Sequence, residues 1–193
     1  EPCDDHQVDF IYRIFNADGH EVENCGNGAR CIGLYIQHQQ LLDKKVIVLR
    51  TLARDLQIQY RDSDQIVVDM GVPGFQPKTE NGAVDQSLSD YLLDYQGQRI
   101  RYHQVDLGNP HAIIFEETGQ NLSIDALGCW MNAHKDFPDG INVSVVNIVD
   151  ENKINLRVYE RGAGVTMACG SAACAGSSRP RQSRRCTDSC RER

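Results

Sequence analysis

The sequence contains one short segment twice, and this repeat limits the fold more than any other feature. Cys25-Gly26-Asn27-Gly28-Ala29 aligns with Cys169-Gly170-Ser171-Ala172-Ala173 when the chain is shifted by 144 residues (169 − 25). In both copies an arginine, Arg13 or Arg157, stands twelve residues before the cysteine, and a strand-like segment and a glycine-containing turn come between. Two such strand–turn–Cys-Gly–helix units predict two similar lobes whose helix N-termini meet at a shared cleft.

The spacing of apolar residues predicts the other elements around this repeat. Period-2 alternation predicts a strand over residues 8–14, and helical spacing predicts a helix from Cys25 to about Leu42. Further strands are expected at 46–49, 56–60, 66–69, 103–106, 111–115, 142–149 and 154–159, and further helices near 88–93, near 124–133 and from Cys169. Asp150-Glu151-Asn152 is expected to be a hairpin turn. Because strands and helices are mixed, the predicted class is α+β.

The chain is expected to divide at Met70-Gly71-Val72-Pro73-Gly74, which interrupts the periodic pattern. Residues 1–69 would then form an N-terminal lobe and residues 70–176 a C-terminal lobe. The last stretch, 177–193, holds six arginines and two acids without a large apolar residue, and it is predicted to be a non-native or disordered tail.

Composition excludes several classes of protein. A net charge of −7 argues against nucleic acid as a partner, and the arginine-rich tail lacks aromatic residues. No apolar run is long enough to span a membrane, and the first residues do not resemble a signal peptide. Eight cysteines occur at irregular spacings without a CxxC pair, so neither a disulfide framework nor a metal site is predicted. Reduced thiols in the cytoplasm are the expected state.

The repeated cysteines suggest acid–base chemistry. A helix N-terminus carries unpaired N–H groups and partial positive charge, so it stabilises a thiolate and binds a carboxylate. If Cys25 and Cys169 flank one α-carbon, one sulfur removes the α-proton and the other returns a proton to the opposite face. Cys31 and Cys174, one to two turns into the helices, are expected to be buried core residues.

Other readings of the cysteines remain open. A single Cys-Gly pair at a helix start is usually structural. A cysteine hydrolase would pair one cysteine with an imidazole such as His111, but this leaves the second copy unexplained. Cys25 and Cys169 would alternatively form a reversible disulfide.

Five separated motifs together resemble the diaminopimelate epimerase family over roughly residues 7–175. They are FNADGHEVENCGNGARC, GNPH, GINVSV, YERGAG and ACGSAAC, and they occur in the family's order. The resemblance implies interconversion of LL- and meso-diaminopimelate without a cofactor or metal, on the route to lysine and peptidoglycan. It also implies two pseudo-symmetric lobes, each a central helix wrapped by mostly antiparallel strands. The expected partners are the diaminopimelate substrate and a second copy of the chain in a homodimer.

The resemblance also implies roles for individual residues. Cys25 and Cys169 match the catalytic cysteines. Glu160 matches a residue near the reacting amino group, and His111 matches a neighbour of a cysteine. Both Glu160 and His111 are expected to modulate the pKa of a catalytic cysteine. The carboxylate-binding helix starts correspond to Gly26, Asn27, Gly170 and Ser171, and the distal end of the substrate is held by Asn16, Asn109, Asn142 and Arg161. Arg161 has an independent argument, because a second carboxylate favours a planar, bidentate partner.

The sequence also departs from the family pattern. It lacks the Gly-Leu-Gly-Asn-Asp-Phe start and the Gly-x-Asp-Gln segment, and 177–193 replaces the family's closing strands and helix. The fold is therefore expected to be incomplete at both ends, and an inactive truncated remnant is one alternative. The other is a related cysteine-pair racemase of proline or hydroxyproline. In the second copy, Ala172 replaces Gly28, which adds a methyl group near the carboxylate-binding backbone.

Overall fold

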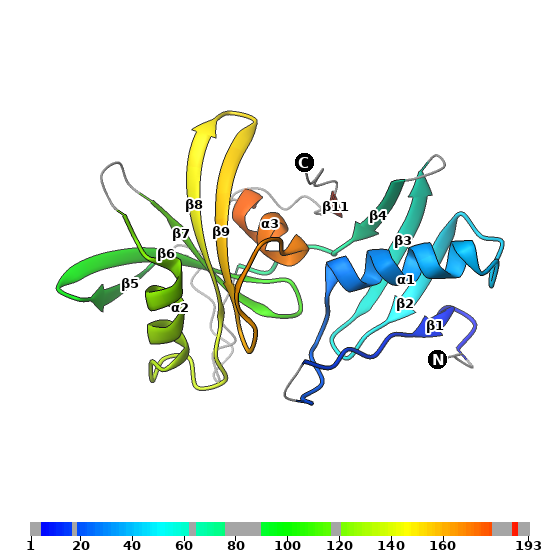
Figure 1. Cartoon of the computed structure of the whole chain (residues 1–193), viewed down its shortest axis with the longest axis horizontal. Helices are drawn as coiled ribbons and strands as arrows, with labels where there is room; N and C mark the ends of the chain where they lie inside the picture. Colours follow the sequence, from blue (N-terminus) through cyan, green and yellow to red (C-terminus); the bar gives the residue numbers. More distant parts are fainter. Residues whose placement is uncertain are drawn as a thin grey trace.

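The structure is a computed structural model that describes residues 5–16, 19–61, 65–75, 90–116, 121–178 and 187–188. It contains two sheets, each packed on a helix, which confirms the predicted α+β class (Figure 1). The strand orders are β1-β2-β3-β4-β11 and β10-β9-β8-β7-β6-β5. Most neighbouring strands are antiparallel, while β1 with β2 and β7 with β8 are parallel.

The first sheet packs against one long helix. Its strands are β1 (Phe10–Ile11), β2 (Val46–Arg50), β3 (Asp55–Arg61), β4 (Gln65–Asp69) and β11 (Thr187–Asp188), and its helix is α1 (Gly26–His38). Alternate residues of β2 and β3 are buried, as expected for strands with one face on a core. Ile36 of α1 packs in the same apolar cluster as Leu49 and Ile58.

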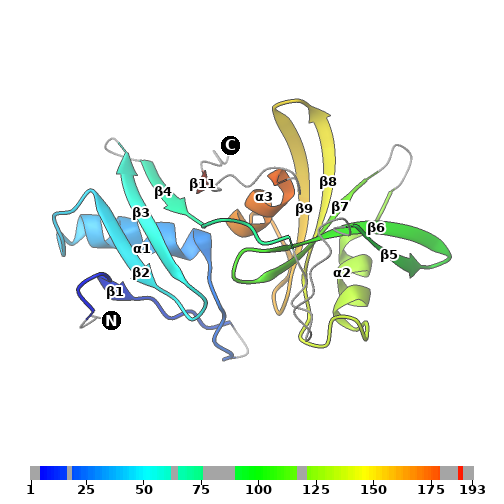
Figure 2. The same ribbon diagram turned by 180° about the vertical axis from the view of Figure 1, so that it is seen from behind.

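The second sheet has a helix on each face (Figures 1 and 2). Its strands are β5 (Asp90–Tyr95), β6 (Gln98–Asp106), β7 (Pro110–Phe115), β8 (Asn142–Asp150), β9 (Lys153–Glu160) and β10 (Gly164–Thr166), and its helices are α2 (Ile124–Asn132) and α3 (Gly170–Ser177). Ile114 of β7 belongs to the cluster under α2, whereas Ile113 belongs to the cluster that includes Cys174 of α3. This alternation explains why β7 and β8 are apolar at consecutive positions.

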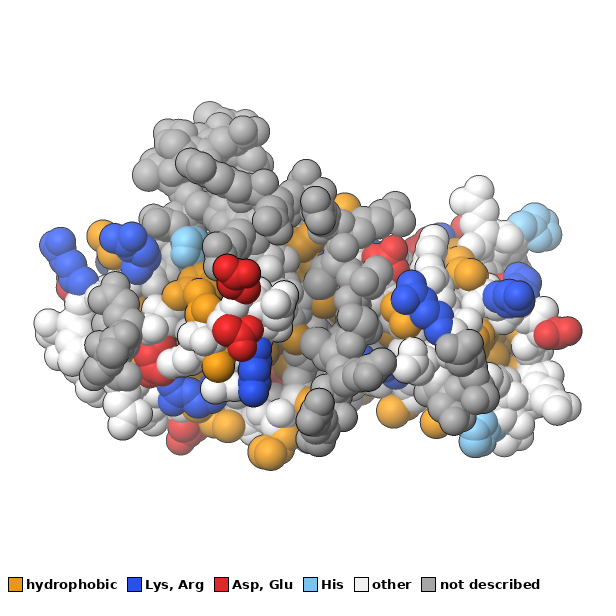
Figure 3. Space-filling model, turned by 90° about the horizontal axis from the view of Figure 1, so that it is seen from above, with side chains coloured by type: hydrophobic (Ala, Val, Ile, Leu, Met, Phe, Trp, Pro, Cys, Tyr) orange, Lys and Arg blue, Asp and Glu red, His pale blue; other side chains and the backbone are white. Residues whose placement is uncertain are grey.

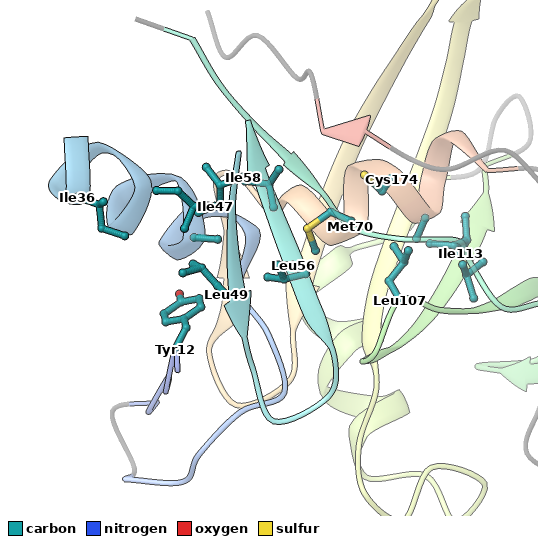
Figure 4. Packing of buried hydrophobic residues seen from close by; sticks show 14 of the residues in the cluster. Tyr12, Ile36, Ile47, Leu49, Leu56, Ile58, Met70, Leu107, Ile113 and Cys174 are labelled. Atoms are coloured by element: carbon teal, nitrogen blue, oxygen red, sulfur yellow. The ribbon is translucent and has the colours of Figure 1, made fainter. Parts of the chain in front are cut away.

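One apolar cluster continues from the first sheet to α3. It runs from Leu56 through Met70 and Leu107 to Cys174, and all four side chains are buried (Figure 4). Because α3 lies between the two sheets in both ribbon views, this shared core holds the N-termini of α1 and α3 close together.

Several element predictions need correction. The helix expected near 88–93 is wrong for its described part, because β5 is a strand there. Leu93 and Tyr95 are buried while Leu92 is exposed, and Gln96 and Gly97 both have positive φ, which fits a two-residue hairpin turn into β6. The strand predicted over 8–14 is reduced to β1, and α1 ends before Leu42. The hairpin between β8 and β9 is confirmed.

The predicted lobe limits stay predictions. The chain leaves β4 after Asp69, but residues 76–89 lie outside the described part. Of the predicted tail, Ser177 and Ser178 end α3, and Thr187–Asp188 pair with β4; residues 179–186 and 189–193 lie outside the description.

The described surface carries charges of both signs. Basic, acidic and hydrophobic side chains are interspersed over both lobes on the face shown in Figure 3. Within the described ranges, no helix combines the length and apolar character needed to cross a bilayer.

Candidate functional site

The two repeated cysteines occupy equivalent positions at the starts of α1 and α3. Cys25 is the N-cap of α1 with φ −149° and ψ 108°, and Cys169 is the N-cap of α3 with φ −142° and ψ 111°. Each cysteine carbonyl accepts the first helical hydrogen bond, from Ala29 at 2.9 Å and from Ala173 at 3.0 Å. Both helices therefore begin from a cysteine with the same extended cap backbone.

The sulfurs differ in their immediate contacts. The Gly28 amide donates to Cys25 Sγ over 3.4 Å, so this sulfur caps its helix directly. Cys169 Sγ lies 3.4 Å from the Ser171 hydroxyl instead. Both thiols are free.

The difference between Gly28 and Ala172 in the two copies has a steric reason. A Cβ at Gly28 would overlap the Tyr12 hydroxyl oxygen. In the second copy the residue aligned with Tyr12 is Leu156, which has no hydroxyl group, and Ala172 is fully buried there.

A hydrogen bond links the two helix starts. The Asn27 amide in the first turn of α1 donates to the backbone carbonyl of Ala168, next to Cys169, over 3.2 Å. The Asn27 side-chain oxygen accepts a hydrogen bond from Arg30. Asn27 is thus held from both ends of its amide, and it ties the first helix to the segment that carries the second cysteine.

A cavity opens between these helix starts and holds about 650 Å³ of space, counting its open mouth. Every site residue that the resemblance implies, apart from His111, lines it. They are Asn16, Cys25, Gly26, Asn27, Asn109, Asn142, Glu160, Arg161, Cys169, Gly170 and Ser171. They come from both halves of the chain, so the shared cleft expected from the repeat is present in the structure.

Arg161 is held firmly at this cavity. Its backbone N–H donates to the Asn142 side-chain oxygen over 3.0 Å, and the Asn142 amide donates to the Pro110 carbonyl over 3.1 Å. The guanidinium donates to the Asp139 carbonyl over 3.2 Å and to both carboxylate oxygens of Glu23 over 2.7 and 2.6 Å. The alkyl stem of Arg161 also lies against Gly140, where an added Cβ would come within 2.9 Å of it.

Burial keeps Cys169 protonated. It raises the pKa of Cys169 to about 12, and the nearby Glu160 carboxylate adds to the rise, while the Ser171 hydroxyl and the Ala172 amide oppose it. The expectation that the helix N-terminus favours the thiolate is wrong for Cys169, because desolvation outweighs the effect of the helix end. Glu160 is itself fixed by the Thr166 hydroxyl, which donates to it over 2.6 Å.

His111 does not line the cavity but supports a residue that does. It is fully buried on β7, with Nε2 3.1 Å from the Asn109 side-chain oxygen and with Nδ1 unpaired within the described residues. Burial, reinforced by the charge of Arg161, lowers the pKa of His111 to about 3, so the ring is neutral. The cysteine–imidazole hydrogen bond that a cysteine hydrolase would use is replaced by this contact with Asn109.

The neutral His111 should make the fold sensitive to acid. In the folded chain the pKa of His111 is about 3, below its usual value of 6.5. The neutral His111 ring therefore contributes fully to the free energy of unfolding above pH 6.5, and this contribution is lost as the pH falls toward 3. Between pH 7 and pH 5 the unaltered chain should lose about 2 kcal/mol more unfolding free energy than His111→Gln, measured by urea denaturation. His38→Gln, at the exposed end of α1, should keep the unaltered pH dependence. Equal slopes for the unaltered and His111→Gln chains would contradict this assignment.

Two polar cavity residues were not predicted. Glu23 pairs with Arg161, and the buried Asn24 donates from its amide to the Leu107 carbonyl over 2.9 Å. Glu23 and Asn24 directly precede Cys25. No sequence pattern identifies them as site residues, because their partners Arg161 and Leu107 are distant in the sequence. The prediction that Cys174 is buried is confirmed, while that for Cys31 is wrong: its side of α1 faces away from the sheet and is exposed.

Comparison with known proteins identifies the family. The sequence model of the diaminopimelate epimerase family matches residues 3–76 and 103–191. The chain belongs to the diaminopimelate epimerase family. The diaminopimelate epimerase of Thioalkalivibrio sulfidiphilus is 40% identical over 174 residues, which are 90% of this chain and 63% of that protein. The Coxiella burnetii protein of the same name is 43% identical over 176 residues, 91% of this chain and 63% of that protein. The chain therefore spans about three fifths of these epimerases.

Solved structures show that the fold extends beyond this epimerase family. A hydroxyproline epimerase from Agrobacterium vitis superposes with a TM-score of 0.66 at 18% identity, over 90% of this chain and 56% of that one. A probable proline racemase from Agrobacterium radiobacter K84 superposes with a TM-score of 0.57 at 17% identity, over 80% of this chain and 50% of that one. At this level of identity the likeness concerns the fold alone.

Proposed function

We propose that this chain carries the reacting centre of an enzyme that interconverts LL- and meso-diaminopimelate by two-base catalysis. One observation supports this above all others. Cys25 and Cys169 cap two helices with nearly the same geometry and line the same cavity. A carboxylate between the two helix N-termini can accept N–H bonds from both, which places the adjoining α-carbon between two sulfurs.

The proposed reaction moves one proton on each face of that carbon. Cys25, as thiolate, takes the α-proton, and the electron pair left behind is delocalised into the carboxylate. Gly26 and Gly170 present backbone donors to the charge that develops there. The thiol of Cys169 gives its proton to the opposite face, so Cys169 ends as thiolate and Cys25 as thiol, and the reverse reaction starts from that state. The raised pKa of Cys169 supports its role as the initial proton donor.

The other end of the cavity suits a long polar substrate. Arg161, Asn16, Asn109 and Asn142 line the same cavity as the two cysteines, and Glu160 stands beside Cys169. We assign the arginine and asparagines to the distal end of diaminopimelate and Glu160 to the reacting amino group. Proline has no distal charge to occupy Arg161, so the racemase alternative leaves this part of the cavity without a use.

Deuterium exchange tests the substrate assignment. In deuterated water, the α-proton NMR signal of LL-diaminopimelate should decrease when the chain is added, and that of proline should persist. Exchange with proline alone would favour the racemase alternative. Exchange with neither substrate, by a chain that still unfolds cooperatively, would favour the inactive remnant.

The compartment and assembly belong to the same proposal. Five described cysteines are free, and a thiolate base requires a reducing environment, so we assign the enzyme to the cytoplasm. A homodimer is the proposed assembly, and sedimentation equilibrium tests it.

A further inference from the structure

We propose that Glu23 and Arg161 act as a charge pair that selects substrates with both an ammonium and a carboxylate at the distal end. This inference rests on the proposed function and makes Glu23 a specificity-determining residue. It concerns the distal end of the substrate, where the resemblance implies Arg161 and three asparagines but no acidic residue.

The pair is built into the cavity wall from both lobes. Glu23 comes from the segment before α1, and Arg161 follows β9; both line the cavity. Their side chains are 31% and 25% exposed, so a ligand can reach them although they are largely desolvated. Both Glu23 oxygens accept from the same guanidinium nitrogen, Nη2, so neither Nε nor Nη1 of Arg161 donates to Glu23.

Donor and acceptor counts show room for two ligand groups. A guanidinium has five N–H donors, and here Nη2 donates to Glu23 while one Nη1 donor goes to the Asp139 carbonyl. The Nε donor and the second Nη1 donor form no hydrogen bond with the described residues, and either can donate one hydrogen bond to a ligand carboxylate. Each Glu23 oxygen keeps lone-pair capacity for an ammonium.

Charge balance makes the pair selective. The ion pair with Glu23 neutralises the charge of Arg161. A ligand whose distal end has only a carboxylate would bind Arg161 but would be repelled by the Glu23 carboxylate. A distal amino-acid group carries both charges, and its ammonium can contact Glu23 while its carboxylate contacts Arg161. The pair therefore favours diaminopimelate over 2-aminopimelate, which has the same carbon chain but lacks the distal amino group.

Two simpler roles for Glu23 make different predictions. If Glu23 only fills the arginine site until substrate displaces it, removing its charge would strengthen binding of both ligands equally. If it only fastens the two lobes together, removing its charge would weaken binding of both equally. A selective role alone changes the preference between the two ligands.

The experiment compares Glu23→Gln with Glu21→Gln by isothermal titration calorimetry. Glu21 is a matched control, because its carboxylate pairs with Arg13 outside the cavity lining. The unaltered chain and Glu21→Gln should prefer LL-diaminopimelate over L-2-aminopimelate. Glu23→Gln should weaken diaminopimelate binding roughly 10- to 100-fold without weakening 2-aminopimelate binding, because one charge-assisted contact is lost. Glu23→Asp keeps the charge and should retain the preference.

The outcomes separate this inference from the proposed function. An unchanged ratio of the two affinities in Glu23→Gln overturns the inference, whichever direction both affinities move. If diaminopimelate binds with the expected preference but its α-proton does not exchange, the specificity role stands and the catalytic proposal fails. If the unaltered chain binds neither ligand, both are overturned.

Discussion

Replacing either repeated cysteine by alanine should abolish the interconversion of LL- and meso-diaminopimelate. Each sulfur serves one face of the α-carbon, and a positioned acid or base contributes roughly 10²- to 10⁴-fold to a rate. Cys25→Ala and Cys169→Ala should each therefore lose at least the lower end of this range, measured by NMR of the two isomers over time. Cys25 and Cys169 are both only half-buried at helix caps, so neither substitution should unfold the chain. Far-ultraviolet circular dichroism should thus remain unchanged.

A cysteine outside the cavity provides the control for this experiment. Cys31 lies on the exposed side of α1, so Cys31→Ala should keep the unaltered rate. Full interconversion by Cys169→Ala would rule out the two-base mechanism. Equal loss in all three variants would show that thiol removal acts through the fold rather than through the reacting centre.

Gly128→Ala should destabilise the C-terminal lobe by about 3 kcal/mol. Gly128 of α2 packs directly on Tyr159 of β9, where an added Cβ would lie 2.5 Å from the Tyr159 Cβ and Cδ2 and closer still to Cγ. These atoms are near the root of the tyrosine side chain, so the helix or the strand itself must move. Because Glu160 and Arg161 follow Tyr159 directly, the same movement should weaken diaminopimelate binding.

A second helical glycine separates this steric effect from helix propensity. At Gly176 of α3 an added Cβ would lie 3.3 Å from Val146 and 3.4 Å from Leu156, which is close to ordinary contact. Gly176→Ala should change stability by less than about 1 kcal/mol, with the gain in helix propensity offsetting mild crowding. Urea denaturation of both variants measures the difference. A Gly128→Ala chain as stable as Gly176→Ala would show that α2 is not closely packed on β9.

The local chemistry of the site could be predicted from the sequence because it is encoded in short segments. A Cys-Gly pair at the start of a helical pattern indicates a helix N-terminus at Cys25, and its recurrence at Cys169 indicates a second one. The repeat thereby implied two equivalent helix ends, and the structure has them with nearly equal dihedral angles. By contrast, β5 was mistaken for a helix, since its short apolar run fits both periods and its Gln96-Gly97 turn was overlooked.

The sequence by itself determined the α+β class, the paired helix N-termini and the set of residues around Cys25 and Cys169. Only the tertiary structure decided how those residues act on one another. Burial, and not the helix end, keeps Cys169 protonated, and complete enclosure keeps His111 neutral. The partner of Arg161 was likewise hidden, because Glu23 is 138 residues away in sequence and meets it only when the two lobes pack together. Local conformation follows from short-range sequence, but desolvation and charge pairing depend on what the rest of the chain places nearby.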